Sequence, residues 1–203
     1  MKNNKDFLDK LSVFSSKIMH DLVAPISAIE MGIEYLSDTI PSNNQAFQLL
    51  KESVERTTSK LNFFRYAFSF AKTSSLSPNE LYKIFSNFLH LSKINLGGEI
   101  NLEEDSLTQK AIACLLFLLA DTLPKGGYIA INQDGNSLTI NGDGPVVVKQ
   151  DKHWNVLLTN SIETLDPYNI LFFITKTALS ESKVSITHFG TTLKSISIHL
   201  NKT

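Results

Sequence analysis

The first 72 residues place apolar side chains at the spacing of an α-helix. From residue 7 to residue 36 the apolar positions form a broad stripe along one face, and a polar segment at 37–44 interrupts it. A second run, from 44 to 72, keeps a seven-residue apolar repeat. Two long helices joined by a short loop are therefore predicted, packed as an antiparallel hairpin. The main stripe position of the first helix recurs at Leu8, Ser15, Leu22, Ile29 and Leu36.

One hairpin is too small to bury stripes of this width. Pairing with a second copy of the chain would cover them in a four-helix bundle, and two-fold dimers are the commonest oligomers. The pattern therefore predicts a homodimer. The alternative is that the C-terminal half of the chain covers the stripe.

The periodicity changes after residue 76. Ser77, Pro78 and Glu80 have the spacing of a capping box with proline at the first helical position, which predicts a helix to about residue 93. The fold class expected is α+β: a helical hairpin over 1–75, followed by a two-layer α/β sandwich over 76–203. The further elements predicted are a short strand pair or a strand and turn within 94–105, helices at 106–123, 152–163 and 167–180, and strand hairpins at 128–142 and 183–200.

Composition excludes several classes of protein. The 203 residues are 42% hydrophobic and carry a net charge of -1, so no basic surface for nucleic acid is expected. The longest apolar stretch, 111–120, is too short to span a membrane, and residues 1–7 lack the apolar core of a secretion signal. We therefore expect a cytoplasmic protein. The single cysteine, Cys114, lies within an apolar run and is predicted to be a core residue rather than a nucleophile.

A histidine beside an aspartate lies in the middle of the first predicted helix, five residues before a proline. His20 falls at the heptad position that points most directly into solvent, so a macromolecular partner can reach its ring. An ordinary surface histidine is the alternative. The residues predicted to share its face, and so to contact a partner, are Ser16, Lys17, Ala24 and Ser27.

The residue types around His20 suit phosphoryl transfer. A neutral imidazole is available near pH 7 because its unperturbed pKa is about 6.5. Asp21 could orient the ring, accept a proton or help to hold a partner's metal ion, and Lys17 could offset the charge of a phosphorylated ring. Pro25 removes the helical hydrogen bond to the carbonyl of Asp21, which predicts a kink beneath the histidine.

These residues also carry a resemblance. The run from 20 to 36 resembles the phosphoacceptor helix of the ChpT-like bacterial histidine phosphotransferases, and segments 63–71, 115–131 and 169–179 resemble later parts of the same family. The residues that match the first motif are His20, Asp21, Leu22, Pro25, Ala28, Gly32, Glu34 and Leu36.

The resemblance implies a phosphorelay shuttle. His20 would accept a phosphoryl group from a receiver-domain aspartate of a hybrid histidine kinase and pass it to response regulators, with Asp21 as its helper. The partner receiver would supply Mg²⁺, and the second domain would be a degenerate histidine-kinase-like domain that binds no ATP.

The sequence itself argues against a nucleotide site. A working kinase domain of this type needs an asparagine on a helix to hold magnesium, and residues 106–123 contain none. Neither glycine segment, 124–127 or 141–145, has the residues of a phosphate loop. The four other histidines show no metal-ligand spacing. An ATP-dependent histidine kinase and a non-catalytic adaptor for response regulators remain as alternatives, and for Arg65 a flanking ion pair or packing of its stem is favoured over a functional role.

Overall fold

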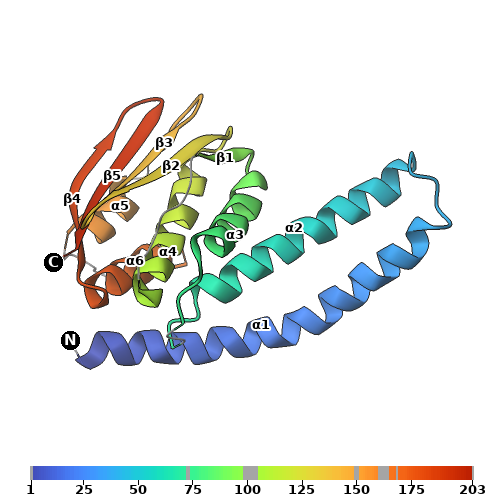
Figure 1. Cartoon of the computed structure of the whole chain (residues 1–203), viewed down its shortest axis with the longest axis horizontal. Helices are drawn as coiled ribbons and strands as arrows, with labels where there is room; N and C mark the ends of the chain where they lie inside the picture. The colour runs from blue at the N-terminus through green and yellow to red at the C-terminus, as the bar shows by residue number, and fades with distance from the viewer. Residues whose placement is uncertain are drawn as a thin grey trace.

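Two long helices project from the side of a five-stranded sheet domain (Figure 1). The computed structural model describes residues 2–71, 74–97, 105–148, 151–159, 165–167 and 169–202. Helix α1 (Lys2–Ser37) and helix α2 (Gln45–Ala67) form the predicted antiparallel hairpin. The side chain of Asn44 caps α2 by accepting a hydrogen bond from the backbone N–H of Phe47 at 3.1 Å.

The base of the hairpin differs from the prediction. Helix α1 begins at Lys2 rather than residue 7, and α2 ends at Ala67 rather than 72. Side chains of α1 hold the chain where it leaves α2, because Ser15 Oγ donates to the carbonyl of Phe68 and Ser12 Oγ accepts from the N–H of Ala71. These contacts stabilise a turn in place of another helical turn.

The seam between α1 and α2 uses only one side of the predicted apolar stripe. Ile33 on α1 and Leu61 on α2 are buried, and Thr58 donates to Glu30 across the seam at 2.6 Å. Ile18 and Ile29 are exposed to 38% and 49%. The broad stripe is therefore only partly covered within one chain.

The first turns of α1 pack on the sheet domain. Leu8 is buried, and the rings of Phe7 and Phe173 meet edge to face with centroids 5.3 Å apart. The alternative expectation, that the C-terminal half covers the stripe, therefore holds for this end of α1 alone.

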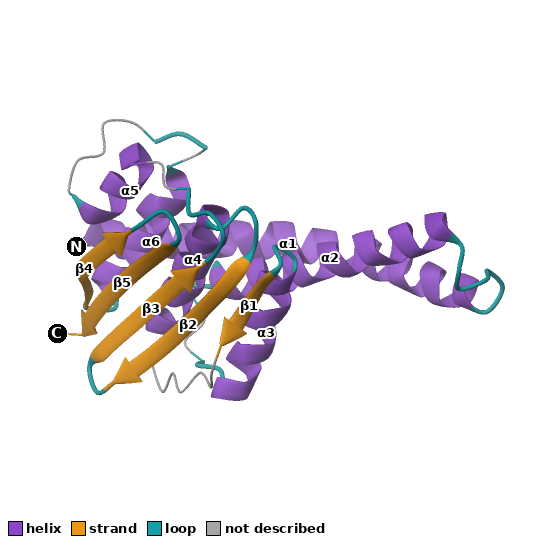
Figure 2. Ribbon diagram, turned by 90° about the horizontal axis from the view of Figure 1, so that it is seen from above, coloured by secondary structure: helices purple, strands orange, loops and turns teal. Residues whose placement is uncertain are grey.

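The sheet domain has the predicted two layers. Its strands lie in the order β1-β2-β3-β5-β4, with β1 parallel to β2 and the other pairs antiparallel. The helices lie on one face of the sheet and leave the other face open (Figure 2). The elements are α3 (Pro78–His90), β1 (Ile94–Gly97), α4 (Ser106–Thr122), β2 (Gly127–Asp134), β3 (Ser137–Asp143), α5 (Asp151–Leu158), α6 (Ile170–Glu181), β4 (Val184–Thr191) and β5 (Ser195–Lys202).

The predicted elements need small corrections. Helix α3 ends at His90 rather than 93, and Lys93 adopts a left-handed conformation with φ 58° as the chain turns into β1. Helix α6 starts at Ile170 rather than 167. The second strand of the pair expected within 94–105 and the last part of the helix expected at 152–163 fall mainly outside the described residues.

Helix α4 forms the centre of the core. Most of its residues are buried, including the predicted core residue Cys114. Burial disfavours the thiolate and raises the pKa of Cys114 to about 12, so this thiol is a poor nucleophile. Phe63 of α2 stacks on Phe88 of α3 with centroids 3.8 Å apart, which joins the hairpin to this core.

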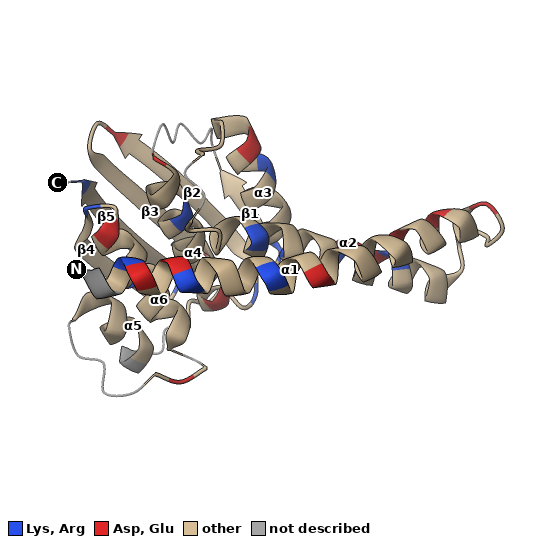
Figure 3. Cartoon of the chain, turned by 90° about the horizontal axis from the view of Figure 1, so that it is seen from below, with Lys and Arg blue, Asp and Glu red and all other residues tan. Residues whose placement is uncertain are grey.

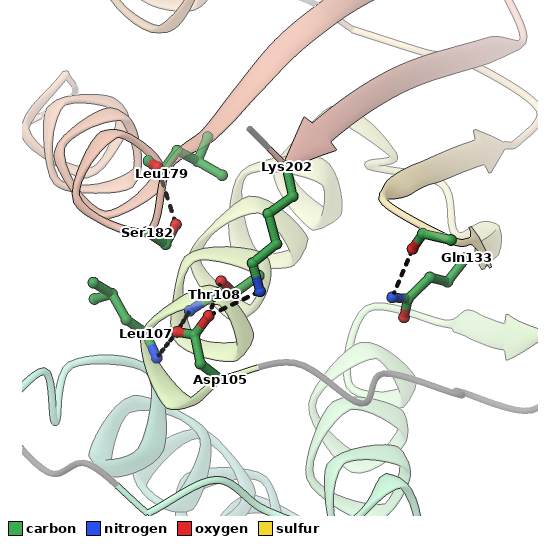
Figure 4. A network of polar contacts seen from close by, with 8 residues as sticks. Asp105, Leu107, Thr108, Gln133, Leu179, Ser182 and Lys202 are labelled. Atoms are coloured by element: carbon green, nitrogen blue, oxygen red, sulfur yellow. Dashed lines mark hydrogen bonds and ion pairs between the residues drawn. The ribbon is translucent and has the colours of Figure 1, made fainter.

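The start of α4 and the linker before α3 are held by side-chain hydrogen bonds. Asp105 caps α4 by accepting from the N–H groups of Leu107 and Thr108, and Lys202 lies 3.2 Å from its other oxygen (Figure 4). Gln109 is buried, accepts from the N–H of Leu76 and donates to its carbonyl, both at 2.9 Å. The side chain of Gln109 thus pairs with both backbone groups of Leu76 and holds the linker against α4.

Candidate functional site

His20 lies in the middle of α1 and is open to solvent, as predicted. Its side chain is 86% exposed. The other residues predicted to share its face, Ser16, Lys17, Ala24 and Ser27, are exposed as well. The ring can therefore be reached by another protein without any rearrangement of the chain.

One carboxylate oxygen links three side chains of this site. Oδ1 of Asp21 accepts a hydrogen bond from Nζ of Lys17 at 2.7 Å, and Nδ1 of His20 lies 3.4 Å from the same oxygen. The spacing i, i+4 puts Lys17 and Asp21 on one side of the helix, whereas Asp21 reaches His20 as its chain neighbour. With Nδ1 directed to the carboxylate, Nε2 is the nitrogen left free.

The same contacts set the charge of Asp21. The hydrogen bond from Lys17, and after it the contact with His20, lower the pKa of the Asp21 carboxyl below its ordinary value. Asp21 is therefore a carboxylate at neutral pH. Figure 3 shows acidic and basic residues interspersed along α1, so the site does not lie in a patch of one charge.

Pro25 lies inside α1, and the helix continues through it. In Figure 1 the first half of α1 runs nearly level and the second half rises, so the helix bends along its length. Because proline has no N–H, the carbonyl of Asp21 lacks its usual helical donor. A backbone acceptor therefore lies one turn below the proline, beside the histidine.

Arg65 does not belong to this cluster. It projects from α2 into a cavity of about 410 Å³ between α2 and α3, which Lys83 also lines. Arg65 makes no hydrogen bond or ion pair with any residue that the structure describes, so of the two roles favoured for it, the flanking ion pair is not found there and packing of its stem stays a prediction. Sequence reasoning did not single out Lys83, because an exposed lysine on an amphipathic helix carries no distinguishing signal.

A smaller cavity, of about 150 Å³, lies at the C-terminal end of α4. Asp121, His153 and Trp154 line it, and partial burial raises the pKa of Asp121 against the opposing charge of Lys60. Its volume is below the range of about 300–1,000 Å³ that is typical of ligand pockets. Trp154 is buried.

Neither a metal cluster nor a membrane span is found in the described part of the chain. No group of three or more His, Cys, Asp or Glu side chains there could hold a metal ion. None of the described helices is long and apolar enough to cross a membrane.

Comparisons with known proteins bear on both parts of the molecule. Residues 78–188, more than half of the chain, match the sequence model of the family described as histidine phosphotransferase C-terminal domain. The protein phosphotransferase ChpT of Brucella abortus (strain 2308) is 24% identical over 134 residues, which are 64% of this chain and 63% of that protein. The match thus covers less than two thirds of this relative.

A solved structure of a bacterial phosphotransferase shares the fold. It aligns over 96% of this chain and 95% of its own with a TM-score of 0.67, at 18% sequence identity. The α+β arrangement of hairpin and sheet domain is therefore one that a known phosphotransferase also has. The family match lies entirely in the second domain, and His20 lies outside it.

Proposed function

The chain belongs to the histidine phosphotransferase family, and from that premise we propose that it carries a phosphoryl group between receiver-domain aspartates through a phosphohistidine at His20. The observation that carries this proposal is the geometry of the hairpin. An 86% exposed imidazole stands beside a carboxylate that is already paired with a lysine. A buried ring could not meet the aspartyl phosphate of another protein.

The transfer is an exchange at phosphorus. Nε2 of His20 attacks the phosphorus of the aspartyl phosphate, the N–P bond forms as the O–P bond breaks, and the receiver's carboxylate leaves with the electron pair. The phosphorylated ring then carries a positive charge with its proton on Nδ1, 3.4 Å from the Asp21 carboxylate. The aspartyl phosphate and the phosphohistidine are both labile, so the protein needs to supply little driving force. Positioning and charge neutralisation then account for most of the catalysis.

Asp21 and Lys17 act as a unit in this proposal. The carboxylate orients the ring through Nδ1 and stabilises or accepts its proton. Lys17 holds the carboxylate at 2.7 Å and offers a cation close to the incoming phosphoryl oxygens. Pro25, one turn further on, leaves a backbone acceptor beside the same residues.

The partners follow from the same chemistry. Receiver domains of a hybrid histidine kinase and of response regulators dock on the face of Ser16, Lys17, Ala24 and Ser27 and bring their own Mg²⁺. No ATP takes part, because α4 lacks the asparagine that a kinase of this type uses for magnesium. The second domain then serves as support for docking.

Two copies of the chain form the active species in this proposal. Ile18, Leu22, Ile29 and Leu36 are 38–49% exposed along one side of α1, and Leu50 is 44% exposed on α2. Contiguous apolar surface of this kind is rare on monomers and marks interaction sites. A four-helix bundle buries this stripe and leaves His20 accessible.

The test of the activity is transfer from a labelled receiver. Receiver domains from the same genome are phosphorylated with radiolabelled acetyl phosphate and mixed with the purified chain. The wild type is expected to take up label, and His20→Ala is expected to lose at least 99% of that uptake with an unchanged thermal midpoint. His90→Ala, which removes an exposed histidine on α3, is the matched control.

Two results would contradict the proposal. Retained labelling of His20→Ala would remove the phosphoacceptor assignment. Labelling of the wild type by radiolabelled ATP alone would favour the histidine kinase alternative.

A further inference from the structure

The cavity between α2 and α3 is lined by positive charge. Arg65 of α2 and Lys83 of α3 are both exposed, and a third cation, Lys110 of α4, is almost fully buried against the same space. No aspartate or glutamate is among the described residues that line it. Asn62 and Asn87 add polar groups from the two helices.

Two of these cations have no partner within the chain. Neither Arg65 nor the ammonium of Lys83 forms a hydrogen bond or ion pair with a described residue. Arginine presents a planar fork of donors that suits carboxylates. Two unpaired cations on one cavity are therefore available to an acidic group from outside.

The cavity lies at the height of His20 along the hairpin. Ser15 contacts Phe68, and Glu30 contacts Thr58, so α1 and α2 run past each other in a known register. His20 lies one third of the way from residue 15 to residue 30. The corresponding point on α2, one third of the way from 68 to 58, is the turn that holds Arg65.

The cavity also lies on the same side of the hairpin as His20. Met19 of α1 is half-buried and Leu61 of α2 is buried at the seam. His20 and Asn62 follow these two residues directly, which rotates each by about 100° in the same sense. In antiparallel helices this places both on one side. Ile29 follows the half-buried Ile26 by three residues, and Leu50 follows the buried Phe47 by three. This spacing rotates them the opposite way, so the exposed apolar stripe lies on the other side.

We infer that this cavity receives an acidic segment of the docked receiver domain, with Arg65 and Lys83 as its specificity-determining contacts. The inference rests on the proposed function and extends its docking surface from α1 to α2 and α3. The lining offers two unpaired cations and no described carboxylate, so its charge is complementary to a segment that carries carboxylates. A dimer that buries the apolar stripe would leave the side of the hairpin that carries His20 and the cavity exposed.

The experiment separates docking from chemistry. The receiver domain that labels the wild type fastest is used as the phosphodonor, and KM and kcat for transfer are measured for Arg65→Gln, Lys83→Gln and the double variant. We expect KM to rise about ten-fold in the double variant with kcat within two-fold of wild type. The KM of the double variant should also depend less on salt, because screening acts on the lost charge pairs.

The matched control is Lys51→Gln, which removes a positive charge from α2 about 21 Å along the helix from Arg65. Its KM should equal that of the wild type. Arg65→Lys should recover part of the loss, and Lys83→Gln, at an exposed position, keeps the test valid if the Arg65 variants do not fold. If the wild type transfers label and the double variant has the KM of Lys51→Gln, the inference is overturned and the proposed function stands. If no receiver labels the wild type, both fail.

Discussion

Oδ1 of Asp21 contacts both Lys17 and His20, so the chemistry proposed for this site depends on a single oxygen. Lys17 keeps this oxygen charged and close to the ring. The amide of asparagine keeps the shape of the side chain but cannot accept the imidazole proton or balance its charge.

Asp21→Asn is therefore expected to slow phosphoryl uptake by ten-fold or more, since general acid–base groups contribute about 10²–10⁴ in rate. Single-turnover transfer from a labelled receiver measures the effect. The thermal midpoint should not change, because the carboxylate is exposed. Asp9→Asn, which changes another exposed aspartate of α1, is the control, and equal rates for the two variants would exclude Asp21 from the chemistry.

One residue, Asp105, caps the N-terminus of helix α4. Asp105 accepts from two backbone N–H groups and from the hydroxyl of Thr108, and it pairs with Lys202 of the last strand (Figure 4). Partial burial raises the pKa of this carboxyl, but the hydrogen bonds from Thr108 and the charge of Lys202 outweigh it, and the net pKa is lowered. The cap thus depends on pH.

A lowered carboxyl pKa stabilises the folded chain above the unfolded value of about 4, and this contribution is lost as the pH falls through the folded value. Asparagine caps helices without titrating. Between pH 5 and pH 3 we therefore expect Asp105→Asn to lose less of its unfolding free energy than the wild type, measured by urea unfolding. Equal losses would mean that the carboxylate is not stabilised by folding. Asp105→Ala, which cannot cap, should cost about 1 kcal/mol at pH 7.

The hairpin and the sheet domain are joined by buried polar contacts as well as by aromatic packing. Gln109 holds the backbone of Leu76 with two hydrogen bonds and accepts a third from the hydroxyl of Tyr66 on α2. One side chain of α4 therefore contacts the hairpin and the linker together.

Gln109→Leu should lower the free energy of unfolding by at least about 2 kcal/mol, because each buried polar group left unpaired costs about 1–3 kcal/mol. Urea unfolding measures this change. Gln48→Leu removes an exposed hydrogen bond to the carbonyl of Ser42 and should cost less than about 0.5 kcal/mol. A cost for Gln109→Leu no larger than for the control would show that water replaces the lost bonds.

The assembly can be tested through the apolar stripe. Ile29→Glu is expected to convert a dimer of about twice the 22.6 kDa chain mass into a monomer, because a charge would be buried at the bundle core. Light scattering after size-exclusion chromatography gives the mass. Met31 is 56% exposed and lies about 200° around α1 from Ile29, so Met31→Glu should remain dimeric. A wild-type monomer would contradict the proposed assembly.

Periodicity and local chemistry were enough to predict much of this molecule. The seven-residue repeats predict the hairpin, alternation and turn residues predict the strand hairpins, and Ser77 with Glu80 predicts the start of α3. The exposure of His20 also follows from its heptad position, because helical geometry determines on which side of a helix a residue lies. These features depend on neighbours in the chain.

Contacts between distant segments could be decided only by the tertiary structure. The packing of Phe7 on Phe173, the turn that ends α2 at Ala67 and the cavity that brings Arg65 near Lys83 each join residues far apart in the chain. No periodic pattern records such pairs, because the free energy of each contact depends on how whole helices pack. The sequence determined which face each helix presents, and packing decided which of those faces meet.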